Sequence, residues 1–345
     1  ALKRFDAARY AELQWQVDGA DENGLVWDML SHLGTQLRKP GTGGLLGTLT
    51  PNWVYLGGQS QSGMYLNTYL SAFADRLAVA RDGAKPLFDG YLNLVGPASV
   101  AIRSGGANPQ KLYKATAVPQ IAIMSEAEHK FSQLPASPGF PPFAAYVRPA
   151  DSDSASSKFR LYEIAGAPHA DPTSPIIPNN PEIAKANNGR ERAPKLYTGA
   201  HVETQLNIDP FVNAALENLH QWAANGVAAP AAMGNWMRYS TAVDGNARTQ
   251  YTPLRDPYGN ALGGLRSPMI EAPLHRYYAF RNDSAFDTDG SMVPLDATLR
   301  AGLYPGGRNE YLARYDAAAD ALVAGRYLLA DDAKTLKDWA RAQSF

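Results

Sequence analysis

The feature that most constrains the fold is the segment of residues 53–80, which changes from a strand pattern to a helix pattern through a turn of small residues. Residues 53–56 read WVYL, a short apolar run typical of a strand that is covered on both faces. The turn, residues 57–63, reads GGQSQSG, and a helical pattern then continues to about residue 80. A strand, tight turn and helix in direct succession are typical of α/β proteins.

Three more apolar segments, residues 90–95, 118–124 and 159–165, are predicted strands, and the residues between them suffice for crossover connections. We therefore predict a mostly parallel sheet flanked by helices. Residues 21–38 are predicted to form a helix, because apolar side chains repeat at helical spacing: Leu25, Val26, Met29, Leu30, Leu33 and Leu37.

Two segments lack apolar periodicity and are predicted loops, residues 134–157 and residues 171–194. Structureless segments longer than about 12 to 15 residues often shape a substrate entrance, and the alternative is a pair of surface excursions. From Asp209 onward the pattern is helical or irregular, with an N-cap at that residue and a helix end at Gly226. We predict a core over residues 1–200 and a helical or irregular C-terminal region over residues 201–345 that packs on it.

Composition excludes several classes of function. The 32 Lys and Arg nearly balance the 33 Asp and Glu, and no basic run appears, so we expect no nucleic-acid partner. There is no cysteine, which excludes thiol nucleophiles and thiolate metal sites, and no two of the six histidines stand four residues apart as zinc ligands on a helix do. No apolar run approaches the ~20 residues that span a bilayer. We expect no metal, no cofactor and no membrane span.

Ser60 is the candidate nucleophile. Gly58 and Ser62, two residues before and after it, are small, as a sharp strand-to-helix turn requires where the two elements pass close to each other. The turn would place the hydroxyl at a helix N-terminus, where the backbone N–H of Gln61 is an expected oxyanion donor. Ser62 competes for the role but has the large Met64 two residues later. The alternative is a Ser/Gly-rich loop without catalytic function.

His169 is the candidate general base. It follows a predicted strand through the sequence Gly-Ala-Pro-His and lies downstream of Ser60, in the chain order nucleophile, acid, histidine. An isolated loop histidine is usually a surface group, but this order and context favour a base that takes the proton of Ser60.

The candidate acid follows the predicted strand that ends at Met124, where the sequence reads Ser-Glu-Ala-Glu-His. A turn of the form Gly-x-x-acid would select Glu128, while Glu126 lies nearer to the strand end. We favour Glu128 slightly, and Asp151 and Asp153 are further alternatives. A buried carboxylate here would orient the imidazole and stabilise its charged form.

Several segments resemble a bacterial family whose members are labelled alpha/beta hydrolase domain-containing proteins: residues 2–10, 58–63, 125–128, 162–171, 259–268 and 309–315. The resemblance covers essentially the whole chain. It implies the α/β-hydrolase fold and the same triad of Ser60, His169 and Glu128 or Glu126, and it implies little about the substrate.

The chain departs from the superfamily pattern before Trp53. In the superfamily several strands precede the nucleophile strand, and a loop after an early one donates the second oxyanion N–H. The residues before Trp53 look helical and loop-like, so the first strands of the sheet are missing from this pattern. We hypothesise that an N-terminal segment or a companion chain completes the sheet, and with the absence of cysteine this favours a secreted or periplasmic protein.

Arg266 is a candidate substrate-binding residue, since it lies in the flexible sequence GGLRSP and could pair with a carboxylate. We favour the alternative, a structural ion pair that ties the C-terminal region to the core.

Together these residues predict hydrolysis of a carboxylic ester or lactone, in a small-molecule or polymeric substrate, through an acyl-enzyme on Ser60. An acyltransferase or amidase with the same triad is the nearest alternative. A catalytically inert binding protein of hydrolase shape is an alternative of a different class.

Overall fold

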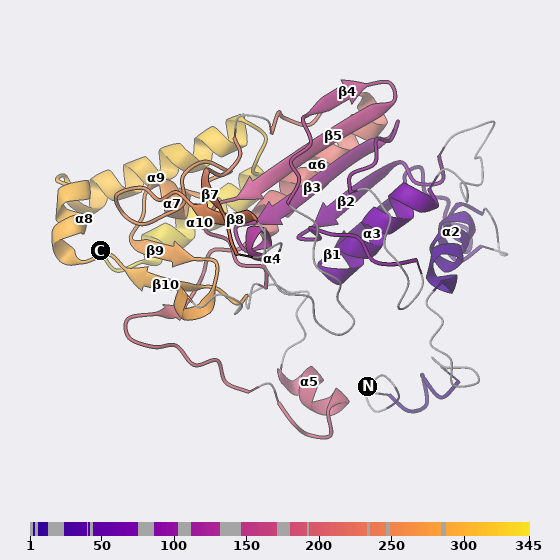
Figure 1. Cartoon of the computed structure of the whole chain (residues 1–345), viewed down its shortest axis with the longest axis horizontal. Coiled ribbons are helices and arrows are strands. Elements are labelled where there is room, and N and C mark those ends of the chain that lie inside the picture. Colours follow the sequence, from indigo (N-terminus) through magenta and orange to yellow (C-terminus); the bar gives the residue numbers. More distant parts are fainter. Residues whose placement is uncertain are drawn as a thin grey trace.

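The computed structural model describes residues 3, 6–12, 24–39, 41, 44–74, 86–102, 112–131, 146–170, 180–191, 193–232, 235–245, 249–283 and 288–345. Its centre is a five-stranded sheet with the strand order β1-β2-β3-β5-β4 (Figure 1). The strands are β1 (Tyr55–Gln59), β2 (Gly90–Leu94), β3 (Pro119–Ser125), β5 (Ser157–Ile164) and β4 (Ser152–Ser154).

The predicted α/β class with a mostly parallel sheet is confirmed. β1, β2, β3 and β5 run parallel to their neighbours, and only the short β4 is antiparallel. All seven residues of β3 are buried, which explains the apolar run of residues 121–124 at its centre. β1 begins two residues later than the apolar run suggested and includes the first glycines of the turn.

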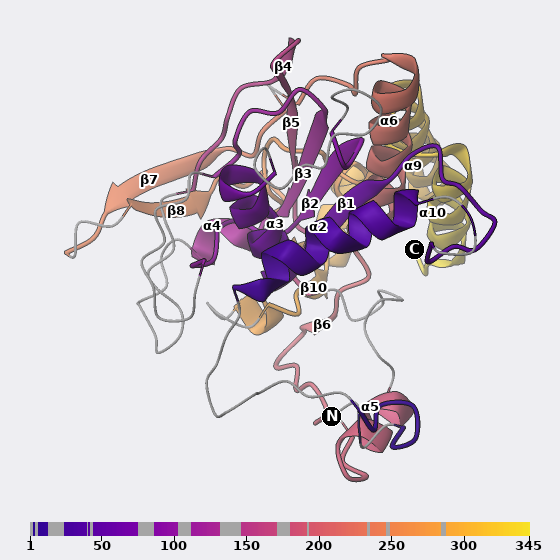
Figure 2. The same ribbon diagram turned by 90° about the vertical axis from the view of Figure 1, so that its right-hand side faces the viewer.

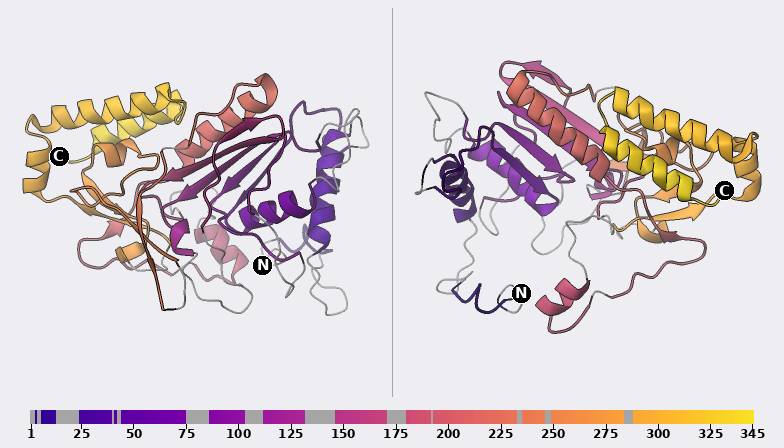
Figure 3. Two further views of the ribbon diagram at one scale, coloured as in Figure 1. Left: turned by 45° about the horizontal axis from the view of Figure 1, so that its top comes forward. Right: turned by 180° about the vertical axis from the view of Figure 1, so that it is seen from behind.

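Helices cover both faces of the sheet. α3 (Gln61–Ala72) packs against β1 and β2 on one face, and α6 (Asp209–Asn225) packs against β2 and β3 on the other (Figures 1 and 3). α6 begins with a proline in its first turn and ends at Gly226 in the left-handed conformation, as predicted. The predicted N-cap is wrong by one residue: Ile208 is the N-cap, without a side-chain hydrogen bond, and Asp209 is already helical. Two helical layers on a parallel sheet leave the carboxyl ends of the strands as the edge where a site can form.

α2 (Leu25–Arg38) packs beside α3 through a face that the sequence predicted only in part. The buried side chains are Trp27 and Ser31, with Gly34, while much of the predicted stripe is exposed: Leu25, Met29 and Leu33. Trp27 stacks on Phe73, at 5.1 Å between ring centroids. Gly34 is required because a Cβ there would lie 2.7 Å from the Phe88 ring. Aromatic and small residues therefore make the centre of this contact, and Val26, Leu30 and Leu37 of the predicted stripe pack against its edge.

The two predicted loops contain short elements. β4 forms a hairpin with β5 inside residues 134–157, and α5 (Asn180–Ala186) lies inside residues 171–194. The loop prediction is wrong at these two places, because a three-residue strand and a helix without buried residues produce no apolar periodicity. Residues 134–145, 171–179 and 192 of these segments lie outside the described residues.

The C-terminal region combines helices with small sheets. It contains β6 (Val202–Glu203), β7 (Tyr239–Val243), β8 (Thr249–Pro253), α7 (Pro268–Glu271), β9 (His275–Tyr278), η1 (Arg281–Asp283), β10 (Ser291–Pro294), α8 (Ala297–Leu303), α9 (Gly307–Ala324) and α10 (Ala330–Ala342). The β7–β8 hairpin and the α9–α10 pair extend from opposite sides of the molecule (Figure 2).

One hydrophobic core joins this region to the sheet. The largest buried cluster contains side chains of β2, β3, β5 and α6 together with others of α7, β9, α9 and α10. The division at residue 200 therefore stays a prediction, with one shared core across it. In the part of the chain that the structure describes, no helix has the length and apolarity needed to cross a membrane.

Candidate active site

Ser60 lies between β1 and α3 in an unusual backbone conformation. Its φ of 54° and ψ of −120° place a residue with a Cβ in a region that costs conformational energy. The turn is held by the Ser60 N–H, which donates to Leu94 O at 2.8 Å, and by the Met64 N–H, which donates to Ser60 O at 3.0 Å. The sharp bend that the sequence predicted is present at this residue.

The small neighbours are sterically required. A Cβ on Gly58 would lie 2.4 Å from the carbonyl oxygen of Ser62, and one on Gly63 would lie 2.5 Å from Asn93 Oδ1. The strand and the helix therefore approach each other more closely here than a side chain permits. The glycines allow the bend that exposes the Ser60 hydroxyl at the start of α3.

An amide network that sequence reasoning missed supports this turn. Asn93, fully buried in β2, donates through Nδ2 to Asn67 Oδ1 of α3 at 2.9 Å and to Gly96 O at 3.0 Å. Its Oδ1 accepts the Gly96 N–H at 3.1 Å. The available signal was one asparagine in an otherwise apolar strand, because a buried amide needs hydrogen-bond partners. The network fastens α3 to the sheet directly behind Ser60.

His169 reaches Ser60 from the loop after β5. The Ser60 Oγ and His169 Nε2 atoms lie 2.8 Å apart. The loop turns at Gly166, whose φ of +71° favours glycine, and a Cβ there would lie 2.7 Å from Ile270. The imidazole is 16% exposed, so solvent and a ligand can approach it.

The structure places Glu128, and not Glu126, on His169. Glu128 begins α4 (Glu128–Phe131), is fully buried, and its Oε1 lies 2.6 Å from His169 Nδ1. Its Oε2 accepts a short hydrogen bond from the Ser125 N–H. Both carboxylate oxygens are thereby engaged, and a hydrogen bond on Nδ1 sets the tautomer that leaves Nε2 free to accept a proton.

Glu126 has different partners. Its Oε2 accepts the Gly166 N–H at 2.9 Å, and its Oε1 lies 2.5 Å from Arg255 Nη2. The side chain is 2% exposed. Sequence reasoning missed Arg255, because it lies 129 residues away and no local pattern marks it.

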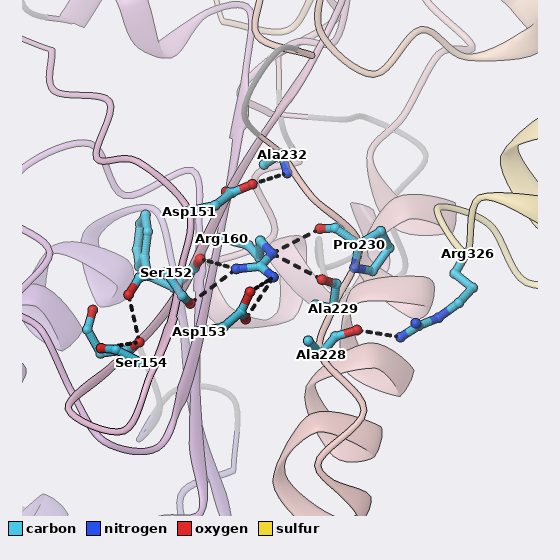
Figure 4. A network of polar contacts seen from close by, with 12 residues as sticks. Asp151, Ser152, Asp153, Ser154, Arg160, Ala228, Ala229, Pro230, Ala232 and Arg326 are labelled. Atoms are coloured by element: carbon cyan, nitrogen blue, oxygen red, sulfur yellow. Dashed lines mark hydrogen bonds and ion pairs between the residues drawn. The ribbon is translucent and has the colours of Figure 1, made fainter.

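Asp151 and Asp153 belong to a network of polar contacts around Arg160 of β5, away from the loop that carries His169 (Figure 4). Asp153 binds Arg160 Nη2 through both oxygens, at 2.8 and 2.9 Å. Asp151 Oδ2 accepts the Ala232 N–H at 2.7 Å. The first pair joins β4 to β5, the second joins the residue before β4 to the segment after α6, and neither of them reaches His169.

Gln61 and Ser62 occupy the first turn of α3. The backbone N–H of Gln61 lies at the start of the helix, where N–H groups have no acceptor within the helix and the dipole is positive. Its role as an oxyanion donor stays a prediction. Of the two serines, it is Ser60 whose hydroxyl lies against His169.

Arg266 is bound by protein groups. It lies 2.9 Å from Asp256 and 2.8 Å from Glu271, and it also donates to the carbonyl oxygens of Ala261 and Ile270. This arrangement is a structural ion pair, as we favoured over substrate binding. It does not tie the C-terminal region to the core, however, because all four partners lie within residues 256–271 of that region.

A second histidine, His129, lies directly after Glu128 but in a closed environment. Its ring lies between those of Tyr146 and Tyr239, at 4.0 and 3.9 Å between centroids. Burial lowers the pKa of His129 well below its usual value, and the positive charge of Arg148 lowers it further. His129 is therefore neutral near pH 7.

A pocket of about 280 Å³ lies beside α4. Its lining includes Glu126, Arg255, Tyr251 and Phe280, so aromatic and charged groups share it. Within the described residues, no three side chains of His, Asp or Glu come together as metal ligands would.

Comparisons with known proteins assign the family. Residues 1–338 match the family described as "Alpha/beta hydrolase domain". No curated protein and no solved structure matches the chain. Since the match covers nearly the whole chain and the parallel sheet with its flanking helices agrees with it, the chain belongs to the alpha/beta hydrolase domain family and is a hydrolase of that superfamily.

Proposed function

We propose that the protein is a serine hydrolase that cleaves carboxylic esters or lactones through an acyl-enzyme on Ser60. The observation that carries the proposal is the continuous chain from the Ser60 hydroxyl through His169 to Glu128, with distances of 2.8 and 2.6 Å. A nucleophile, a base and an orienting carboxylate at hydrogen-bond distance are the three groups that acyl transfer to serine uses.

In the first half of the reaction, Ser60 Oγ forms a bond to the substrate carbonyl carbon while its proton moves to His169 Nε2. The carbonyl electron pair moves to oxygen, and the Gln61 N–H stabilises that oxyanion. When the carbonyl re-forms, the bond to the alcohol oxygen breaks and His169 gives its proton to the departing alkoxide. The result is an ester between the acyl group and Ser60.

In the second half, water takes the place of the alcohol. His169 Nε2 accepts a proton from the water as its oxygen bonds to the acyl carbon, and the proton then returns to Ser60 Oγ as the acyl-enzyme bond breaks. Glu128 orients the imidazole and stabilises the imidazolium in both halves. These steps use three side chains, one backbone N–H and water, and they apply to a small-molecule or a polymeric ester.

We also propose that a further strand, from an N-terminal segment or a companion chain, pairs with β1. Among the described residues β1 has a strand on one side only, and each of its residues is partly or fully exposed, whereas β3 is buried throughout. An open parallel edge of this kind is a ready template for pairing, and its loop could supply a second oxyanion donor. Hydrogen exchange in the intact protein tests this: slow exchange of residues 55–59, equal to that of β2, is expected, and fast exchange contradicts it.

A fluorophosphonate probe tests the nucleophile. We expect labelling of the wild type at Ser60, none in Ser60→Ala, and much slower labelling in His169→Ala. Full labelling of Ser60→Ala would move the nucleophile to Ser62. An unlabelled wild type would contradict the proposal and favour a catalytically inert binding protein.

A substrate panel then tests the bond that is cleaved. Esters and lactones of different chain length should be hydrolysed with release of one acid per bond. Amides cleaved at equal or higher rates would indicate an amidase. Acyl products formed on added alcohols in place of free acid would indicate an acyltransferase.

A further inference from the structure

We propose that Glu126, held by Arg255, is a positioning residue for the loop that carries His169. This inference rests on the proposed function, because it concerns how the base is kept in line with Ser60. The turn after β3 would then use two carboxylates for two tasks. Glu128 binds the imidazole of His169, and Glu126 binds the backbone of the loop that carries it.

Glu126 holds the loop at two consecutive residues. Its carboxylate accepts the Gly166 N–H at 2.9 Å, and its own backbone N–H donates to the Ala167 carbonyl at 3.2 Å. Only Pro168 separates these residues from His169. The backbone that sets the position of the imidazole is therefore attached to the β3–α4 turn from both its donor and its acceptor side.

The same turn holds the imidazole itself. Glu128 binds His169 Nδ1 at 2.6 Å, and the Ser125 hydroxyl accepts the Ala127 N–H at 3.1 Å, which braces the turn between the two glutamates. A shift of the loop relative to this turn would lengthen the bond to Glu128 and move Nε2 away from Ser60. The hydrogen bond between Glu126 and Gly166 therefore helps to keep the bond between Glu128 and His169 in place.

Arg255 supplies the partner that a buried carboxylate needs in this place. Glu126 is 2% exposed, and the charged guanidinium lies 2.5 Å from its Oε1, on the side away from Gly166. A buried carboxylate without a partner is strongly disfavoured. Arg255 lies after β8 and forms an isolated β-bridge with Ala261. The C-terminal region therefore supplies the positive charge that pairs with Glu126.

Loss of the hydrogen bond between Gly166 and the Glu126 carboxylate should slow the chemical step more than it weakens ligand binding. A misplacement of about 1 Å in a catalytic group costs on the order of 10²-fold in rate. Glu126 contacts the loop backbone and not the Ser60–His169 pair, so the affinity for a ligand at Ser60 should change little.

The experiment measures inactivation by a fluorophosphonate over a range of concentrations, which separates the maximal rate from the half-saturating concentration. For Glu126→Ala we expect the maximal rate to fall on the order of 10²-fold, with the half-saturating concentration nearly unchanged. Glu126→Gln should restore most of the rate, because its amide oxygen can accept the Gly166 N–H. Asp153→Asn, which removes an ion pair at the far side of β5, serves as the matched control and should react as the wild type does.

Hydrogen exchange of a peptide covering residues 165–170 gives a readout that is independent of catalysis. The Gly166 amide should exchange faster in Glu126→Ala than in the wild type and the Asp153→Asn control. If Glu126→Ala fails to fold, Arg255→Met takes its place, with several-fold slower labelling and faster exchange expected.

The outcomes separate the two proposals. A wild type without labelling overturns the proposed function and this inference together. A labelled wild type with Glu126→Ala equally fast, or with unchanged Gly166 exchange, overturns this inference alone. So does a Glu126→Gln variant as slow as Glu126→Ala, because the acceptor bond would then not be what matters. In the Arg255→Met comparison, unchanged rate and exchange overturn it as well.

Discussion

The two ends of the central sheet are built differently. At the β5 end, Arg160 and its partners fasten the strand to β4 and to the segment after α6, and residues 159–164 are buried. At the β1 end, the strand is partly exposed, and α2 presents apolar side chains to solvent. We call the β5 end the closed end and the β1 end the open end. His169 follows the strand at the closed end and Ser60 follows the strand at the open end, so the two residues are held by strands of unequal burial.

The largest expected effect concerns the hydrogen bond between Glu128 and His169, at the closed end of the sheet. Glu128→Gln removes the charge and can turn an amide NH₂ toward His169 Nδ1, which favours the wrong tautomer. We expect kcat for ester hydrolysis to fall about 10⁴-fold with KM little changed. A loss no larger than that of Glu126→Gln would show that Glu128 has no special role.

Arg160→Met probes the stability of the closed end. The guanidinium is 4% exposed and donates to Ala229 O, Pro230 O and Ser152 O, which would lose their partner. Because Asp153 is 56% exposed, the ion pair itself adds little, and we expect the free energy of unfolding to fall by about 2 kcal/mol. Urea denaturation measures this, and a change below about 0.5 kcal/mol would contradict a tightly fastened end.

The pH dependence of stability should report His129, which is buried beside this end. Its native pKa is lowered by burial, so as pH falls below the ordinary value of about 6.5 the unfolded chain takes up a proton that the native protein does not. Stability is therefore full above that pH and declines below it, by up to about 1.4 kcal/mol per pH unit.

His129→Phe should keep the contacts with the tyrosine rings and reduce this slope between pH 6.5 and 5. His275, whose pKa is also lowered by burial, retains a part of it. An unchanged slope in the variant would show that His129 titrates normally.

The smallest expected effect concerns the open end. Met29 of α2 is 67% exposed, so Met29→Gln should change the free energy of unfolding by no more than about 0.5 kcal/mol. Trp27→Ala on the buried face of the same helix is the control, with an expected loss of about 3 to 5 kcal/mol. A large loss in Met29→Gln would indicate that this face is covered in the folded protein.

Much of the fold was predictable because its signals are local. Four parallel strands were marked by short apolar runs, and α6 by its proline and its terminal glycine. The face of α2 was predictable only in part. Val26, Leu30 and Leu37 of the apolar stripe pack on the core. The close approach of Phe88, which selects Gly34, depends on residues far away in the chain. β4 and α5 escaped because they bury too little to leave a pattern.

The sequence by itself determined the bend at Ser60, the glycines that permit it, and the loop that carries His169. Their signals are local in the chain, as in the clash that a Cβ on Gly58 would make with Ser62. The packing of Gly166 against Ile270, by contrast, is a long-range contact that the local pattern does not show. Only the tertiary structure decided that Glu128 binds the imidazole and that Arg255 forms an ion pair with Glu126. Glu126 and Glu128 are two residues apart and chemically alike, and their different partners come from packing among β3, β5 and the C-terminal region, where positions differ by a few ångströms that no local pattern encodes.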